Sequence, residues 1–168
     1  MSDARAVAYL FVACFAEAPW FERFDVSEME AEFVEMARGH NSVIMVADAD
    51  GQVVGCSAGF PMVEKADVME LIEGGAAQAF YLAELFVNSQ YRRQGIARKL
   101  VNARGERAVE LGYTEAVVRT SEDQTIIRKL YAGLGFQIVA TQDVESLKFI
   151  DGIEVMVPDR RVILKGSL

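Results

Sequence analysis

The segment YLAELFVNSQYRRQGIARKL, residues 81–100, limits the possible folds more than any other part of this sequence. It begins as an apolar strand and ends as a basic helix, with Gly95 where one pattern replaces the other. The first N–H groups of a helix lack partners and lie at the positive end of its dipole, so such a turn can bind an anion. Gly95 permits close approach of a ligand, and Arg92 and Arg93 add charge suited to phosphate. The segment predicts a phosphate-binding turn, and an ordinary helix start with surface arginines is the alternative.

The rest of the chain supplies helices and strands on both sides of this turn. A capping box from Ser27 to Glu30 starts an acidic helix that Gly39 ends, and Asp50 with Gly51 predicts a hairpin turn. The predicted helices cover residues 4–17, 28–39, a stretch within 62–78, 95–111 and 124–133. The predicted strands cover residues 43–48, 53–60, 79–87, 113–120, 136–141 and 160–166, while 143–159 contains an Asp-Gly turn and has no clear pattern.

This order of elements predicts a mixed α/β sheet. The helix between the strands at 79–87 and 113–119 makes a right-handed crossover, so these two strands are expected to run parallel. The hairpin at 43–60 makes the remainder of the sheet largely antiparallel.

Length and composition limit the domain number, the location and the binding partners that we expect for this chain. A chain of 168 residues with 52% hydrophobic content predicts one compact domain spanning residues 1–168. We expect no membrane span, no secretion signal and a cytoplasmic location. The formal charge of -8 argues against general nucleic-acid binding. Cys14 and Cys56 are isolated, which predicts reduced core thiols and no metal site.

Common nucleotide-binding motifs do not fit the turn, but one acyl-CoA motif does. The sequence has no GxxxxGK followed by Ser or Thr, and the turn is not GxGxxG. Arg92, Gly95 and Ala97 match (R/Q)xxGx(G/A), the acyl-CoA signature of the GNAT superfamily of N-acetyltransferases. The resemblance extends over roughly residues 43–141, because AELFV, EAVVRT and IIRKLYAGLGF occur in the family's order and approximate spacing.

The resemblance implies a GNAT-type fold: a mixed, mostly antiparallel central sheet with a splayed parallel strand pair and flanking helices. It implies acetyl-CoA as the acyl donor, attacked directly by a neutral amine, and it suggests a homodimer. The residues that it places along the cofactor are Leu85, Phe86 and Val87 beside the pantetheine, and Arg92, Arg93, Gln94, Gly95, Ile96 and Ala97 around the pyrophosphate.

Tyr131 matches the family's LY element, in which a tyrosine protonates the departing thiolate. The alternative is a core residue, because helical spacing puts it in one stripe with Ile126, Ile127, Leu130 and Leu134. Gln124 stands where many members have an asparagine that contacts the cofactor, so this contact is open. Ala97 for glycine is a permitted variation.

Glu84 stands in an apolar row, since strand alternation places it on one face with Phe80, Leu82 and Phe86. Burial there would raise its pKa. Three roles remain open: a base that deprotonates the amine, an anchor for the charge of the substrate, or a solvated residue at a sheet opening.

Other features carry less weight. His40 lies in GHNS between a helix and a strand, which favours a turn or capping role over catalysis, and Ser121 precedes a helix that it could cap. The family's first strand is not visible before residue 4. The N-terminal edge is then open, completed by another subunit, or completed by residues outside this sequence.

The acceptor is expected between the N-terminal helical region, residues 62–78 and residues 143–159. Many acids there would attract a cationic amine of a small molecule or peptide, although acidic helices are more often only solvated faces. Three function classes follow: an amine N-acetyltransferase, which we prefer, a catalytically silent acyl-CoA-binding or regulatory module, and a non-enzymatic anion-binding or assembly domain.

Overall fold

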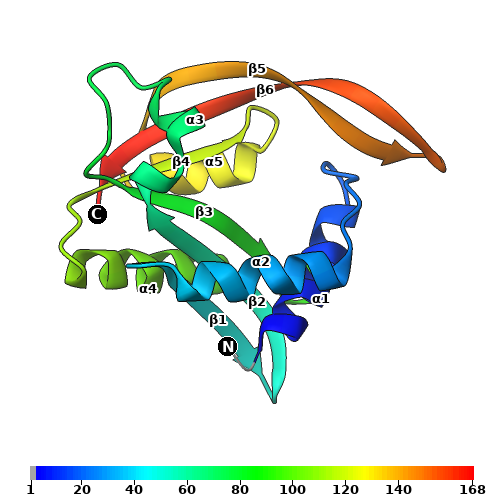
Figure 1. Ribbon diagram of the computed structural model, residues 1–168. Helices are drawn as coiled ribbons and strands as arrows, with labels where there is room; N and C mark the ends of the chain where they lie inside the picture. Colours follow the sequence, from blue (N-terminus) through cyan, green and yellow to red (C-terminus); the bar gives the residue numbers. More distant parts are fainter. Residues whose placement is uncertain (1–2) are drawn as a thin grey trace.

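A computed structural model describes residues 3–168. Within them, six strands form one sheet in the order β1-β2-β3-β4-β6-β5 (Figure 1). The strands are β1 (Val43–Ala49), β2 (Gln52–Pro61), β3 (Phe80–Val87), β4 (Glu115–Ser121), β5 (Gln137–Ile150) and β6 (Ile153–Ser167). The helices are α1 (Ala4–Ala16), α2 (Val26–Arg38), α3 (Ala66–Met69), α4 (Ile96–Glu110) and α5 (Thr125–Ala132), with short 3-10 turns η1 (Met62–Glu64) and η2 (Ser89–Tyr91).

The predicted fold class is confirmed. Strands β3 and β4 are parallel, and the other neighbouring pairs are antiparallel. Helix α4 connects the parallel pair, as the crossover argument expects.

Two layers of helices enclose the sheet. Helices α1 and α2 pack on one face through a cluster that includes Phe11, Phe33, Cys56 and Phe86. Helices α4 and α5 pack on the opposite face, where Leu82 and Tyr131 belong to a second cluster. A third cluster, which includes Met62, Val68 and Tyr81, lies under the segment between β2 and β3. The site described below therefore lies between two separate helical layers.

A β-bulge in β3 corrects the predicted alternation. Leu82 pairs with Gly59 and Glu84 pairs with Ala58, so Ala83 is an extra residue. Cross-strand partners share a face, and Gly59 and Ala58 are consecutive, so Leu82 and Glu84 point to opposite faces. The prediction that Glu84 shares a face with both Phe80 and Leu82 was therefore wrong, although Glu84 does share one with Phe86, beneath α1 and α2.

Gly59 makes the close approach at this bulge possible. A Cβ atom there would lie 2.5 Å from the Phe80 ring and 2.5 Å from the Tyr81 carbonyl oxygen. No larger residue fits without movement of the backbone.

The unassigned stretch 143–159 forms most of a long hairpin, which extends from the sheet past the end of α1 (Figure 1). Strands β5 and β6 pair along their whole length to a two-residue turn at Asp151 and Gly152. Pro158 precedes Arg161, the first residue of β6 that pairs with β4, so Pro158 lies where one edge of β6 is free and a missing N–H is tolerated.

Smaller differences concern caps and helix lengths. The side chain of Asp25, and not that of Ser27, caps α2, because its Oδ1 accepts hydrogen bonds from the N–H groups of Ser27 and Glu28. The helix predicted within residues 62–78 is limited to η1 and the short α3.

Cys14 and Cys56 are buried and unpaired, as predicted, and burial raises the pKa of the Cys56 thiol to about 12. No strand precedes α1 among the described residues, so β1 is an edge of the sheet. None of the helices within residues 3–168 has the length and apolar character needed to cross a membrane.

Candidate active site

The turn between β3 and α4 has the backbone expected of an anion site. Arg93 and Gly95 both have positive φ angles, of 64° and 80°, and Gly95 immediately precedes α4. Within residues 3–168, no group accepts a hydrogen bond from the main-chain N–H groups of residues 93–98. Arg93, Gln94 and Gly95 are exposed. The turn can therefore present several free donors to one ligand.

The neighbouring strands separate beside this turn. Strands β3 and β4 pair only at Phe80 with Ala116 and Tyr81 with Val117. Beyond Tyr81, β3 remains paired with β2 on its other edge as far as Val87. The edge of β3 that faces β4 is thus unpaired from Leu82 onward, and an extended ligand could bond to it.

The side chains at the end of β3 are fixed on both faces. Phe86 is buried under α1, with its ring centroid 5.4 Å from that of Phe11. Leu85 packs on the α4 face and is partly buried, and Val87 is buried. Any contribution of these residues to ligand binding comes mainly from their main chain.

Arg92 and Arg93 differ in their surroundings. The guanidinium of Arg92 donates to the Val87 carbonyl oxygen at 2.9 Å and lies 2.8 Å from the Glu17 carboxylate. Arg92 therefore ties the end of β3 to the residue after α1 and is not a free cation at the turn. Arg93 keeps its exposed position beside the free N–H groups.

Glu84 lies partly buried on the α1 and α2 face of the sheet. Burial raises the pKa of its carboxyl from 4.5 to about 7; the positive charge of Arg104 opposes this shift, whereas the carboxylates of Glu32 and Glu22 add to it. A carboxyl with a pKa near neutrality can exchange a proton with an amine at physiological pH.

Tyr131 lies on the opposite face, on α5, and is almost completely buried. Its ring centroid is 5.3 Å from that of Phe136, so it is also part of the core. Its hydroxyl oxygen accepts a hydrogen bond of 2.7 Å from Nη2 of Arg104. The sequence reasoning missed Arg104, although a signal existed: Leu100, Arg104 and Ala108 recur every four residues on one side of α4.

Gln124 lies directly before α5, and its side-chain Nε2 is buried without a hydrogen-bond partner among the described residues. A buried donor without a partner is costly, so this amide fits a contact to a bound ligand. Together with the free N–H groups and the strand gap, it makes this end of the sheet compatible with acyl-CoA.

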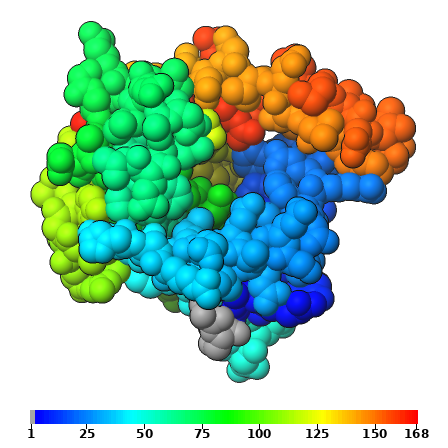
Figure 2. Space-filling model, viewed as in Figure 1, coloured from blue at the N-terminus to red at the C-terminus, as the bar shows by residue number. Residues whose placement is uncertain are grey.

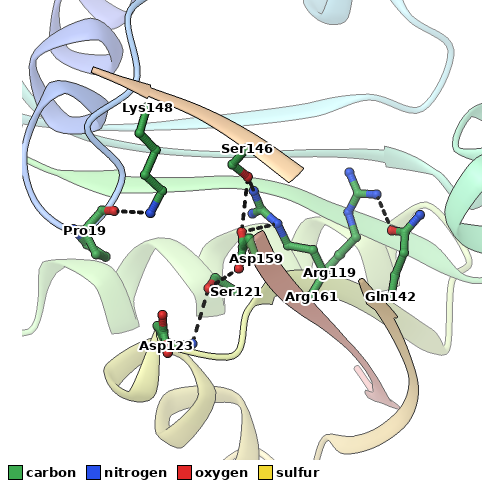
Figure 3. Close-up of polar contacts among 9 residues, drawn as sticks. All are labelled: Pro19, Arg119, Ser121, Asp123, Gln142, Ser146, Lys148, Asp159 and Arg161. Atoms are coloured by element: carbon green, nitrogen blue, oxygen red, sulfur yellow. Dashed lines mark hydrogen bonds and ion pairs between the residues drawn. The ribbon is translucent and has the colours of Figure 1, made fainter. Parts of the chain in front are cut away.

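Ser121 belongs to a polar network at the end of β4 (Figure 3). Its hydroxyl donates to Asp159 at 2.7 Å, and Asp159 also lies 2.7 Å from Nε of Arg161. Lys148 donates to the Pro19 carbonyl oxygen at 2.7 Å, which ties the β5-β6 hairpin to the segment after α1. The Ser121 hydroxyl also accepts a hydrogen bond from the Asp123 N–H, but it does not cap α5.

His40 lies exposed in the turn between α2 and β1.

Two surface hollows lie away from the strand gap. One, of about 290 Å³, lies between the segment after α1 and the β5-β6 hairpin and is lined by residues that include Glu22, Phe24, Phe149 and Glu154. The other, of about 280 Å³, lies between α5 and strands β5 and β6. Among the described residues, no three His, Cys, Asp or Glu side chains gather closely enough to hold a metal ion.

Fold and site together define a class of protein: a mixed sheet that opens between two parallel strands, with a ligand-accessible helix start beside the opening. Within that class, the chain belongs to the acetyltransferase (GNAT) family, whose model matches residues 9–136. The resemblance noted in the sequence is therefore confirmed.

Individual relatives agree with this assignment. N-acetyltransferase family 8 member 2 of Rattus norvegicus is 28% identical over 157 residues, which cover 90% of this chain and 66% of that protein. The chain spans about two thirds or less of the curated relatives reported for it. Among solved structures, the ribosomal-protein-alanine N-acetyltransferase of Brucella melitensis has a TM-score of 0.75 at 19% identity, covering 99% of this chain and 95% of that one. A putative acetyltransferase of Salmonella typhimurium with its cofactor acetyl-CoA has a TM-score of 0.69 at 15% identity, covering 99% and 89%.

Proposed function

We propose that this protein is an N-acetyltransferase that transfers the acetyl group of acetyl-CoA to a primary amine of a small cationic molecule or peptide. The observation that carries the proposal is the strand gap, which has free main-chain donors at one end and Glu84 and Tyr131 on its opposite faces. The family match and the relative named with acetyl-CoA support the choice of donor. Residues 1–168 act as one domain in this proposal.

The cofactor contacts come mainly from the main chain. The N–H groups of residues 93–98 hold the pyrophosphate, and the exposed Arg93 adds positive charge. The edge of β3 that has no strand partner, from Leu85 to Val87, bonds to the pantetheine, and the side-chain amide of Gln124, the residue before α5, contacts it. When bound, acetyl-CoA supplies an activated acyl group on a thioester.

Glu84 and Tyr131 divide the proton transfers. Glu84 takes a proton from the ammonium form of the acceptor, and its raised pKa suits this step near pH 7. Tyr131 gives its proton to the sulfur that leaves. The two groups lie on opposite faces of the sheet, which suits an amine arriving from one side and a thiol departing on the other.

The acceptor enters on the Glu84 face. Burial raises the pKa of Glu84, and the carboxylates of Glu32 and Glu22, from other parts of the chain, add to this shift. In Figure 2 a depression opens between the blue N-terminal helices, the green segment after β2 and the orange hairpin. The hollow of about 290 Å³ beside Glu22 adjoins the blue and orange parts. The negative charges that act on Glu84 favour a cationic acceptor.

A thiol-release screen tests the function. Purified protein is given acetyl-CoA with polyamines, aminoglycosides, amino acids and peptides, and free thiol is measured beside thermal shifts with CoA. Thiol release that requires one amine class supports the proposal. A thermal shift without thiol release for any amine would support a silent acyl-CoA-binding module, and no shift would contradict cofactor binding altogether.

Location and assembly belong to the same proposal. The family resemblance suggests a homodimer, which light scattering of the purified protein tests. We also propose a cytoplasmic location, which cell fractionation tests.

A further inference from the structure

The most unusual side chain outside the proposed acid and base is Arg104. It lies in α4 on the stripe that buries Leu100, Val101 and Ala108, and its exposed fraction is 0%. A fully buried guanidinium is costly unless hydrogen bonds compensate for its lost hydration. The contacts of Arg104 therefore indicate why an arginine lies there.

Three hydrogen bonds connect Arg104 to β2, β3 and α5. Nη1 donates to the carbonyl oxygens of Ala58 at 2.8 Å and Glu84 at 2.7 Å, the pair that flanks the bulge. Nη2 donates to the hydroxyl oxygen of Tyr131 at 2.7 Å. None of these three acceptors is a carboxylate. One planar group thus holds the main chain of Glu84 and the hydroxyl of Tyr131 in a fixed relation.

The direction of the Tyr131 hydrogen bond matters for catalysis. An arginine only donates, so the Tyr131 oxygen must be the acceptor, and its own proton is not used in this contact. Within residues 3–168, no group accepts a hydrogen bond from that hydroxyl. The contact fixes the oxygen and leaves the proton available for donation.

We propose that Arg104 is a positioning residue for the acid step, holding the Tyr131 hydroxyl toward the strand gap and stabilising the oxygen after it has lost its proton. This inference rests on the proposed function. In the step, the O–H bond of Tyr131 breaks and an S–H bond forms with the departing thiolate. The phenolate then keeps the hydrogen bond from Nη2 of Arg104 until a proton returns from water. A hydrogen bond from a cation strengthens as its acceptor becomes negative, so Arg104 favours this transfer.

A purely structural role predicts something different. If Arg104 only joins α4 to the bulge, its loss lowers stability. It then lowers kcat by the same factor whether or not Tyr131 has a hydroxyl. If Arg104 acts through Tyr131, its loss matters only where that hydroxyl is present. A double-mutant cycle separates the two.

The cycle compares Arg104→Met, Tyr131→Phe and the double variant. We expect Arg104→Met to lower kcat about 10- to 100-fold, with the KM for acetyl-CoA within about threefold, because a charge-assisted hydrogen bond is lost mainly in the transition state. In the Tyr131→Phe background the same change should lower kcat less than about threefold. Arg107→Gln is the matched control, since Arg107 lies exposed on the same helix, paired with Glu110, and its kcat should stay within about twofold. Arg104→Lys, which keeps a cationic donor, should lose less than Arg104→Met, and it carries the cycle if Arg104→Met does not fold.

A binding measurement gives a readout without turnover. Affinities are measured for CoA and for desulfo-CoA, which lacks the sulfur that Tyr131 contacts. The wild-type protein should bind CoA more tightly than desulfo-CoA, and both Tyr131→Phe and the Arg104 variant should lose that difference while they bind desulfo-CoA unchanged. Equal weakening of both ligands, or equal kcat losses in both backgrounds, would overturn the positioning role and leave the acetyltransferase proposal intact. Absence of thiol release from the wild-type protein with every amine would overturn the proposed function, and the inference with it.

Discussion

Removal of the Glu84 carboxylate should stabilise the free protein at high pH. Burial raises the pKa of Glu84 from 4.5 to about 7, so the folded state holds this proton more tightly than the unfolded state. As the pH rises between these two values, the carboxyl ionises in the unfolded chain but stays protonated in the fold, so stability is lost until about pH 7. Glu84→Gln cannot ionise and avoids this loss.

The expected size follows from the two pKa values. The difference between 4.5 and about 7 corresponds to about 3 kcal/mol once the carboxyl is fully ionised. Glu84 keeps part of its surface in contact with water, so this figure is an upper bound. The advantage of Glu84→Gln should grow from at most about 1 kcal/mol at pH 5.5 to at most about 3 kcal/mol at pH 9.

Urea unfolding without CoA measures this difference, with the fluorescence of Trp20, the one tryptophan of the chain, as the signal. Glu70→Gln serves as the control for loss of a surface carboxylate and should stay within about 0.5 kcal/mol of the wild type. A difference between Glu84→Gln and the wild type that is the same at pH 5.5 and pH 9 would refute the argument from burial.

Three further predictions concern the acid, the base and the glycines. Tyr131→Phe should lower kcat about 10²- to 10⁴-fold, measured by thiol release, and should still give a thermal shift with CoA, with only the affinity difference between CoA and desulfo-CoA lost; full activity would remove its role. In the wild type, kcat/KM calculated from the ammonium form of the acceptor should rise tenfold per pH unit up to about pH 7 and then level off, because Glu84 must be ionised to take a proton from that form; retention of this limb in Glu84→Gln would exclude Glu84 as the base. Gly95→Ala should cost about 1 kcal/mol through its positive φ and weaken CoA binding, whereas Gly59→Ala, whose Cβ would meet the Tyr81 carbonyl oxygen, should cost about 1–3 kcal/mol and lower the melting temperature by several degrees. An unchanged CoA affinity in the first, or an unchanged melting temperature in the second, would contradict these arguments.

The sequence predicted the turn at Gly95 and the parallel pair because both depend on local patterns. A strand that gives way to a helix at a glycine fixes where the free N–H groups lie, and a crossover helix fixes the strand direction. The elements that carry this signal, β3 and α4, lie close to their predicted bounds.

The orientation of Glu84 could not be predicted in the same way. Period-two alternation assumes an unbroken strand, and the extra residue Ala83 reverses the faces after Leu82. The bulge involves Gly59 in another strand and Arg104 in α4, which donates to the carbonyl oxygens of Ala58 and Glu84, the pair next to the bulge. Contacts distant in sequence decided this feature.

The β5-β6 hairpin escaped prediction for a different reason. Along much of it exposed residues alternate with only partly buried ones, and few are fully buried, so its residues lack the apolar alternation that marks a half-buried strand. Pro158 also argues against a strand, unless one edge of that strand is known to be free. The structure shows that it is, because β4 pairs with β6 only from Arg161 onward.

A crystal structure of the protein grown with acetyl-CoA tests the central claim most directly. The account predicts phosphate oxygens within hydrogen-bond distance of the N–H groups of residues 93–98, and a thioester in the gap between β3 and β4 with Glu84 and Tyr131 on its two sides. A cofactor bound elsewhere, or a β4 that has closed onto β3 beyond Tyr81, would contradict it.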